Sequence, residues 1–199
     1  LAWAAALFGI LFVYSAAMIY FDPRLASRQT GWAHVYTVVL FFVDTGLLGF
    51  LAMGVGFVAN YLWISGRKNA DAQTRTIQQS LLRDSIKGIS FASIALIGVL
   101  FVIIPIYLVH LGANRGTLND QILLLLNTEY ATLWFLRLFL AFTGAGILSI
   151  FMWYLASQTQ RRGLLYLMVI LAFVCVLAAE VIARYLFYAR NATLLIGGV

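Results

Sequence analysis

The chain has 199 residues, of which 63% are hydrophobic and only 10% are charged. A water-soluble domain needs more polar surface than this to stay in solution, so the composition excludes an ordinary soluble enzyme. We attribute the formal net charge of +6 to loops at a membrane surface and expect no nucleic-acid partner. Apolar runs of roughly 20 residues recur along almost the whole chain, which predicts an all-α, polytopic transmembrane helix bundle.

Five apolar stretches predict five membrane-spanning helices within a single helical domain that covers residues 1–199. The predicted spans are about 1–20, 34–64, 88–110, 130–156 and 164–188. The second and third spans are separated by the only long polar stretch of the chain, which includes NADAQTRTIQQSLLRDSIK. Because the chain starts inside an apolar run at Leu1, without an initiator methionine, we expect it to be an incomplete piece of a longer protein.

Small side chains predict where the helices approach one another closely. Ala52 and Gly56 lie four residues apart on the second predicted span, and Ala145 and Ser149 repeat this spacing on the fourth. Both pairs are expected to face neighbouring helices.

The distribution of basic residues predicts the orientation of the five spans. The loops after the second and fourth spans lie on one side and hold seven cations, Arg67, Lys68, Arg75, Arg83, Lys87, Arg161 and Arg162. The other side holds five, Arg24, Arg28, Arg115, Arg184 and Arg190. The positive-inside rule makes the more basic side cytoplasmic, so the C-terminus is expected on the periplasmic or external side of the membrane.

Ionisable residues inside the spans gather in the outer half of the membrane. With about 1.5 Å of rise per residue, Asp44 lies roughly 15 Å below the outer boundary and Arg137 roughly 10 Å below it. Glu180 lies roughly 24 Å above the inner boundary on the last span. Inserting a charged side chain at such depth costs at least about 2.5–3.5 kcal/mol of free energy. Each of these groups is therefore expected to have a polar partner or a function.

Several pairings are open to these residues. Glu180 and Arg184 are four residues apart on one helix face and can pair locally, while Arg137 has a depth similar to that of Glu180 on a neighbouring span. These pairs either only hold helices together or support a functional site. Asp44 is predicted either to form a helix-packing hydrogen bond or to exchange protons.

Few residues are available to bind a metal or haem. The chain has one cysteine and two histidines, and His34 and His110 both fall at the outer boundary. A pair of histidines on facing helices can hold a haem, but such ligands usually lie within the spans. We therefore expect neither metal nor haem in this chain, with a haem-bearing cytochrome subunit as an alternative.

Three stretches resemble the membrane-anchor subunit of DMSO reductase-type molybdenum oxidoreductases. They are SAAMIYFDPRLASRQTGWAHVYTVVLFFVDTGLLG from Ser15, YATLWFLRLFL from Tyr130 and AAEVIARYLFYAR from Ala178. The last is similar to the family pattern Ala/Gly-Glu-x-x-Gly-Arg-x-x-Phe-Tyr, with Ala183 in place of the usual glycine. Such anchors have eight helices, and the five predicted here would be the last five.

The resemblance implies a quinol-oxidising subunit that is not active alone. It implies that the anchor oxidises a quinol such as menaquinol near the outer face, as part of anaerobic respiration. Electrons would pass to an iron–sulfur subunit and then to a molybdopterin catalytic subunit. The residues of this chain expected to support the quinol site or handle protons are Asp44, Arg137, Glu180 and Arg184, and Tyr185 and Tyr188 are expected at the partner subunit or the lipid headgroups.

Two alternatives to quinol oxidation remain. A transporter or channel would need polar residues through both halves of the bilayer and often has broken helices. Pro105 is the only proline within a predicted span, and the inner half of the spans lacks ionisable residues. A purely structural anchor would hold soluble subunits without any quinol chemistry.

Overall fold

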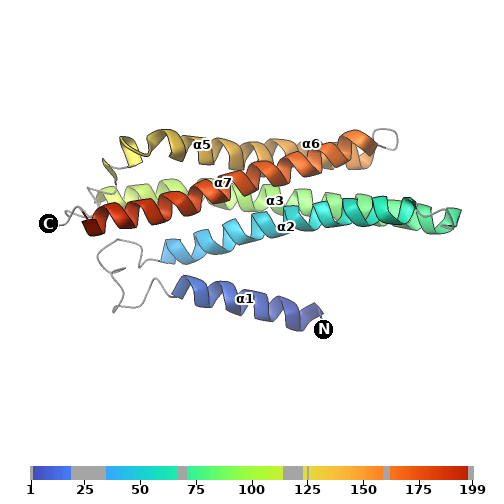
Figure 1. Cartoon of the computed structure of the whole chain (residues 1–199), viewed down its shortest axis with the longest axis horizontal. Helices are drawn as coiled ribbons and strands as arrows, with labels where there is room; N and C mark the ends of the chain where they lie inside the picture. Colours follow the sequence, from blue (N-terminus) through green and yellow to red (C-terminus); the bar gives the residue numbers. More distant parts are fainter. Residues whose placement is uncertain are drawn as a thin grey trace. The chain divides into compact units, whose positions relative to one another are not determined.

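The protein is all-α, as the sequence predicts, and its structure is a computed structural model. The structure describes residues 2–18, 35–66, 71–113, 123–124, 126–158 and 162–196. Within these ranges the helices are α1 (Ala2–Met18), α2 (Val35–Ser65), α3 (Ala72–Ala113), α5 (Ala131–Ala141), η3 (Phe142–Leu148), α6 (Ser149–Ser157) and α7 (Arg162–Ile196). Figure 1 shows their order along the chain.

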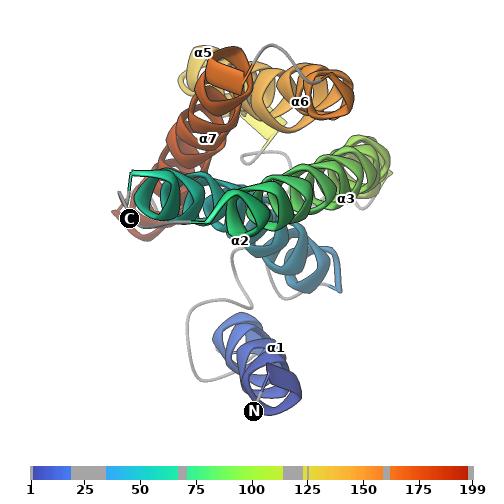
Figure 2. The ribbon, with the colours of Figure 1, turned by 90° about the vertical axis from the view of Figure 1, so that its right-hand side faces the viewer.

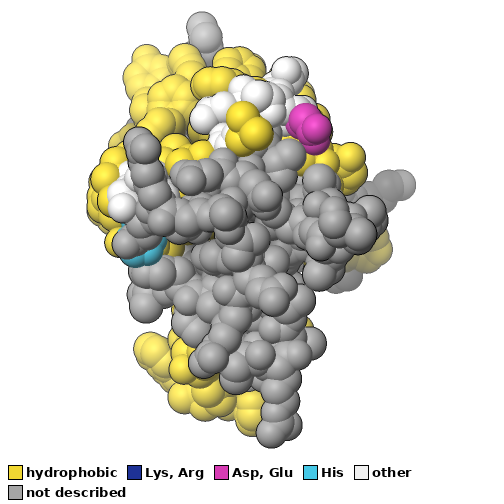
Figure 3. Space-filling model, turned by 90° about the vertical axis from the view of Figure 1, so that its left-hand side faces the viewer, with side chains coloured by type: hydrophobic (Ala, Val, Ile, Leu, Met, Phe, Trp, Pro, Cys, Tyr) yellow, Lys and Arg dark blue, Asp and Glu magenta, His cyan; other side chains and the backbone are white. Residues whose placement is uncertain are grey.

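Within the described residues, four helical segments are long and apolar enough to cross a membrane. They are Val38–Ser65, Ala72–Ala113, Ala131–Ser157 and Arg162–Leu186, and a shorter apolar helix covers Ala6–Met18. Many large apolar side chains point outward, including Phe12, Phe91 and Phe135, which are 75%, 66% and 70% exposed. A surface of this kind is suited to lipid, and Figure 3 shows hydrophobic side chains over much of the described surface on one face. The chain is a multi-pass membrane protein.

Helix α3 is longer than its predicted span, because it begins at Ala72 and not near residue 88. The stretch from Ala72 to Lys87 contains neither glycine nor proline and is rich in glutamine, leucine and arginine, which favour helix. Leu82 and Ile86 are buried at 4% and 0% exposure, four residues apart on one face. The polar stretch is therefore a helical extension that packs through one apolar face.

The fourth predicted span is one helical rod that changes type in its middle. Residues 142–148 form the π-helix η3. It joins α5 to α6, the two helices labelled on either side of it in Figure 1. Gly144, Ala145 and Gly146 within it are all buried. The hydroxyl of Ser149 donates to the Gly144 carbonyl oxygen at 3.5 Å, five residues earlier, across the widened turn.

The contacts of the chain cluster into two compact units. Unit 1 comprises residues 1–45, 99–136 and 181–199, and unit 2 comprises residues 46–98 and 137–180. Helices α2, α3, α5 and α7 each contribute to both units, so this division does not test the prediction of a single domain.

Unit 2 contains four helical segments, and each of them contacts at least one other. Gly54 of α2 faces Ile86 and Ile89 of α3 and Val169 of α7. Helix α3 meets α6 through the rings of Phe91 and Trp153, 6.5 Å apart, and η3 packs directly on α7. Figure 2 shows the helices nearly end-on, from the side at which α7 begins.

Candidate functional site

Two of the predicted site residues are almost completely buried. Asp44 on α2, in unit 1, and Arg137 on α5, in unit 2, are each 8% exposed. Each takes part in an interaction with its surroundings, as expected for an ionisable group that is kept away from lipid. Their burial agrees with the expectation from depth. Whether they handle protons stays a prediction.

Arg184 lies in unit 1 and stacks on an aromatic ring. Its guanidinium carbon Cζ is 4.3 Å from the centroid of the Phe41 ring on α2. This cation–π contact joins α7 to α2 and partly compensates the removal of the guanidinium from water. Phe41 was not among the predicted site residues, since nothing in an apolar helix indicates which phenylalanine meets a cation.

Replacing Phe41 with leucine should weaken this contact while leaving the site apolar. We expect the Phe41→Leu and Arg184→Gln substitutions to be coupled by about 1 kcal/mol in the free energy of unfolding. A double-mutant cycle in mixed detergent micelles, followed by circular dichroism, measures this coupling. The same cycle with Phe42→Leu, the neighbouring ring, serves as the control. A coupling near zero for Phe41 would show that the contact contributes nothing.

Glu180 lies on α7 in unit 2 and is half-buried. It has at least one interaction with its surroundings. The proposed pairs of Glu180 with Arg184 or with Arg137 stay predictions. Its partial burial fits a group that is shielded from lipid by other side chains.

An aromatic cluster occupies unit 1 on α2 and α3. The ring of Tyr36 lies 6.0 Å from that of Tyr107 and 5.8 Å from the imidazole of His110, measured between centroids, and both pairs are edge-on. Tyr107 and Leu111 are buried and pack against Trp134. His110 is therefore part of an aromatic packing cluster. His34, its partner in the haem alternative, lies outside the described residues.

Tyr185 and Tyr188 are open to the surroundings of unit 1. They are 57% and 60% exposed on α7. Exposed tyrosines near the end of an apolar helix suit the headgroup zone or a partner protein, because one end of the ring is apolar and the hydroxyl is polar. The prediction that they contact a partner subunit stays open.

Among the described residues, no group of three or more histidine, cysteine, aspartate or glutamate side chains could hold a metal ion. The expectation that the iron–sulfur clusters and molybdopterin belong to partner subunits is a prediction that this observation does not test.

In comparisons with protein-family models, with curated proteins and with solved structures, nothing matches the chain. The likeness to molybdoenzyme anchors therefore depends on the three sequence stretches alone.

Proposed function

We propose that this chain is the five-helix C-terminal part of the membrane anchor of a DMSO reductase-type molybdenum oxidoreductase, and that it supports quinol oxidation. The observation that carries the proposal is the burial of Asp44 and Arg137 inside apolar helices, each only 8% exposed. A quinol releases two electrons and two protons when it becomes a quinone. A protein that oxidises it needs apolar surroundings for the ring and buried polar groups that take up the protons.

Three candidate residues have distinct roles in this proposal. Asp44 accepts a proton from the quinol, because a carboxylate within the membrane is suited to proton exchange. Arg184, held over the Phe41 ring in the same unit as Asp44, supplies positive charge that favours the release of protons. Glu180 carries protons toward the outer boundary, near which the sequence places it.

The proposed partners come from the resemblance to molybdoenzyme anchors. An iron–sulfur subunit accepts the electrons from the quinol one at a time and passes them to a molybdopterin catalytic subunit. The proposed setting is the cytoplasmic membrane of a bacterium or archaeon, with the C-terminus outside. Menaquinol is the proposed donor, and the complex rather than this chain alone is the active enzyme.

Gentle purification of the protein from its native membrane tests the proposal. We expect two larger subunits to copurify, together with iron and with molybdenum or tungsten. Mass spectrometry and metal analysis identify them. A lone polypeptide without these metals would contradict the anchor assignment.

The π-helix η3 is the observation that favours a transporter as the second candidate. Irregular turns inside membrane helices often occur where a substrate or ion binds. A protein that purifies alone and carries out substrate-dependent flux in proteoliposomes would be such a transporter.

A further inference from the structure

Unit 2 contains an open polar cleft of about 450 Å³ between α3, the end of α6 and the start of α7. Four of its lining residues, Ser80, Arg83, Asp84 and Lys87, lie on α3, and Ser80, Arg83 and Lys87 share one helix face at spacings of three, four and seven residues. Ser157, the last residue of α6, and Arg162, the first residue of α7, line the opposite side. Its volume is within the range of sites that bind small molecules.

The cleft is basic, since it holds three cations and a single carboxylate. Two of the cations are held in place by the protein. Arg83 Nη2 donates to the Gln158 carbonyl oxygen at 3.2 Å, and Arg162 Nη1 donates to the Tyr61 hydroxyl oxygen at 3.2 Å. A guanidinium has five N–H donors, so each arginine keeps donors beyond this hydrogen bond for an anion in the cleft. Arginines that are already positioned lose less freedom on binding.

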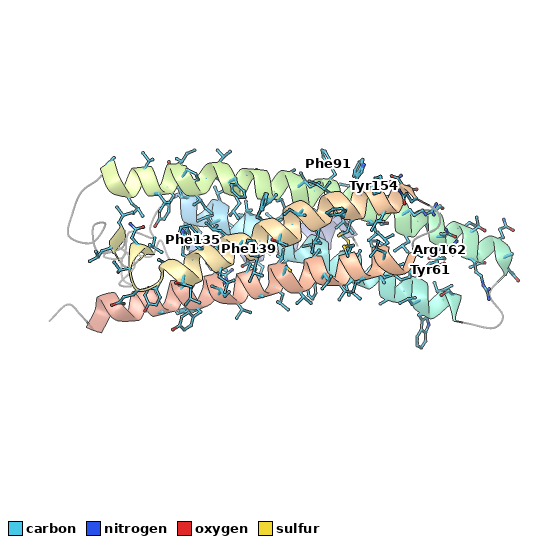
Figure 4. The ribbon with its side chains drawn as sticks, turned by 90° about the horizontal axis from the view of Figure 1, so that it is seen from above. Tyr61, Phe91, Phe135, Phe139, Tyr154 and Arg162 are labelled. Carbon is cyan, nitrogen blue, oxygen red and sulfur yellow. The ribbon has the colours of Figure 1, made fainter. Side chains whose placement is uncertain are left out.

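The cleft lies at the level where apolar helices meet water. Arg162 begins the last long apolar segment, and α2 ends at Ser65, just beyond Tyr61. The rings of Tyr61 and Tyr166 are 6.1 Å apart beside the cleft, and Figure 4 shows Tyr61 and Arg162 close together. Trp63 and Tyr154 are 69% and 60% exposed on α2 and α6. Exposed tryptophan and tyrosine at helix ends mark the headgroup layer.

We propose that this cleft binds the phosphate group of an anionic glycerophospholipid. Basic pockets between membrane helices on the cytoplasmic side recognise anionic headgroups, and the positive-inside rule predicts that side for this end of unit 2. Arg83, Lys87 and Arg162 hold the phosphate, while Ser80 and Ser157 offer hydroxyl donors. The proposal does not depend on quinol oxidation.

Native mass spectrometry of the full chain, with phosphatidylglycerol and with phosphatidylcholine of the same acyl chains, tests the site. We expect phosphatidylglycerol to bind more tightly. Arg83→Gln, Lys87→Gln and Arg162→Gln should each weaken its binding about fivefold, because each removes one charged contact from a partly exposed site. The matched control is Arg75→Gln, which removes one cation from the same helix outside the cleft lining and should change the affinity less than about twofold.

If Arg162→Gln disturbs folding, Lys87→Gln still tests the site. The Lys87 ammonium forms no hydrogen bond within the described residues, so its loss removes a cation of the cleft without breaking a structural contact. Equal losses in Arg75→Gln and in the cleft variants would overturn the proposal, as would unchanged binding in all of them. Displacement of phosphatidylglycerol by inorganic phosphate alone would reassign the cleft to free phosphate. Binding of a polyglutamate peptide in place of the lipid, dependent on the same residues, would reassign it to an acidic protein.

Discussion

Replacing Gly144 with alanine should lower the free energy of unfolding by about 2–3 kcal/mol. Gly144 lies on η3 where this segment packs on α7. A Cβ atom there would be 2.8 Å from the carbonyl oxygen of Ala172 and 2.9 Å from both Cys175 Cβ and Val176 Cγ2. Two of these three atoms are fixed by the backbone of α7, so no side-chain rotation relieves the clash. The helices must separate, or the π-helix must shift.

Gly98 supplies the matched control for this substitution. It lies on α3, and a Cβ atom added to it meets nothing within 4 Å. Gly98→Ala should therefore be neutral or stabilising by up to about 1 kcal/mol, because alanine favours helix. Unfolding of both variants in mixed micelles, followed by circular dichroism, gives the comparison. Equal stability of the two variants would show that η3 and α7 do not pack as described.

Hydropathy predicts the membrane-spanning helices well because a span must be long and apolar. The second span, expected at residues 34–64, is helix Val35–Ser65, and the last, expected at 164–188, lies within Arg162–Ile196. Hydropathy says nothing about a helix that continues into water. The start of α3 at Ala72 was therefore missed, although the spacing of Leu82 and Ile86 is the signal that could have found it.

Helix-to-helix contacts were predicted only in part. Ala145 and Ser149 are fully buried at 0% exposure, as expected. Ala52 and Gly56 are exposed, and the prediction for them is wrong. Gly54 and Gly46 are the glycines of α2 that face other helices. A helix that is apolar all around has no polar face to fix its rotation, so sequence alone does not distinguish these positions.

The candidate site also has features that the sequence predicts and features that it does not. The burial of Asp44 and Arg137 was predictable because the free energy of exposing a charge to lipid is large. The ring of Phe41 under Arg184 and the π-helical turn beside Gly144 depend on how side chains of separate helices meet. Neither leaves a periodic signal in the sequence.

Replacing Asp44 with asparagine should lower quinol turnover by the assembled complex about 100-fold. Asparagine has nearly the same shape and can still form hydrogen bonds, but its side chain does not accept a proton at neutral pH. The proposed role of Asp44 is to take up a proton from bound quinol. The loss should therefore appear in kcat, with a small change in KM. Steady-state oxidation of a menaquinol analogue by membranes that contain the complex measures both.

Asp71 provides the matched control for this substitution, since it is an exposed aspartate just before α3. Asp71→Asn removes the same charge outside the apolar core and should leave turnover unchanged. Copurification of the partner subunits with Asp44→Asn separates a chemical defect from failed assembly. An Asp44→Asn complex that assembles fully and keeps full turnover would remove Asp44 from proton transfer. Asp44 would then have a purely structural role in helix packing.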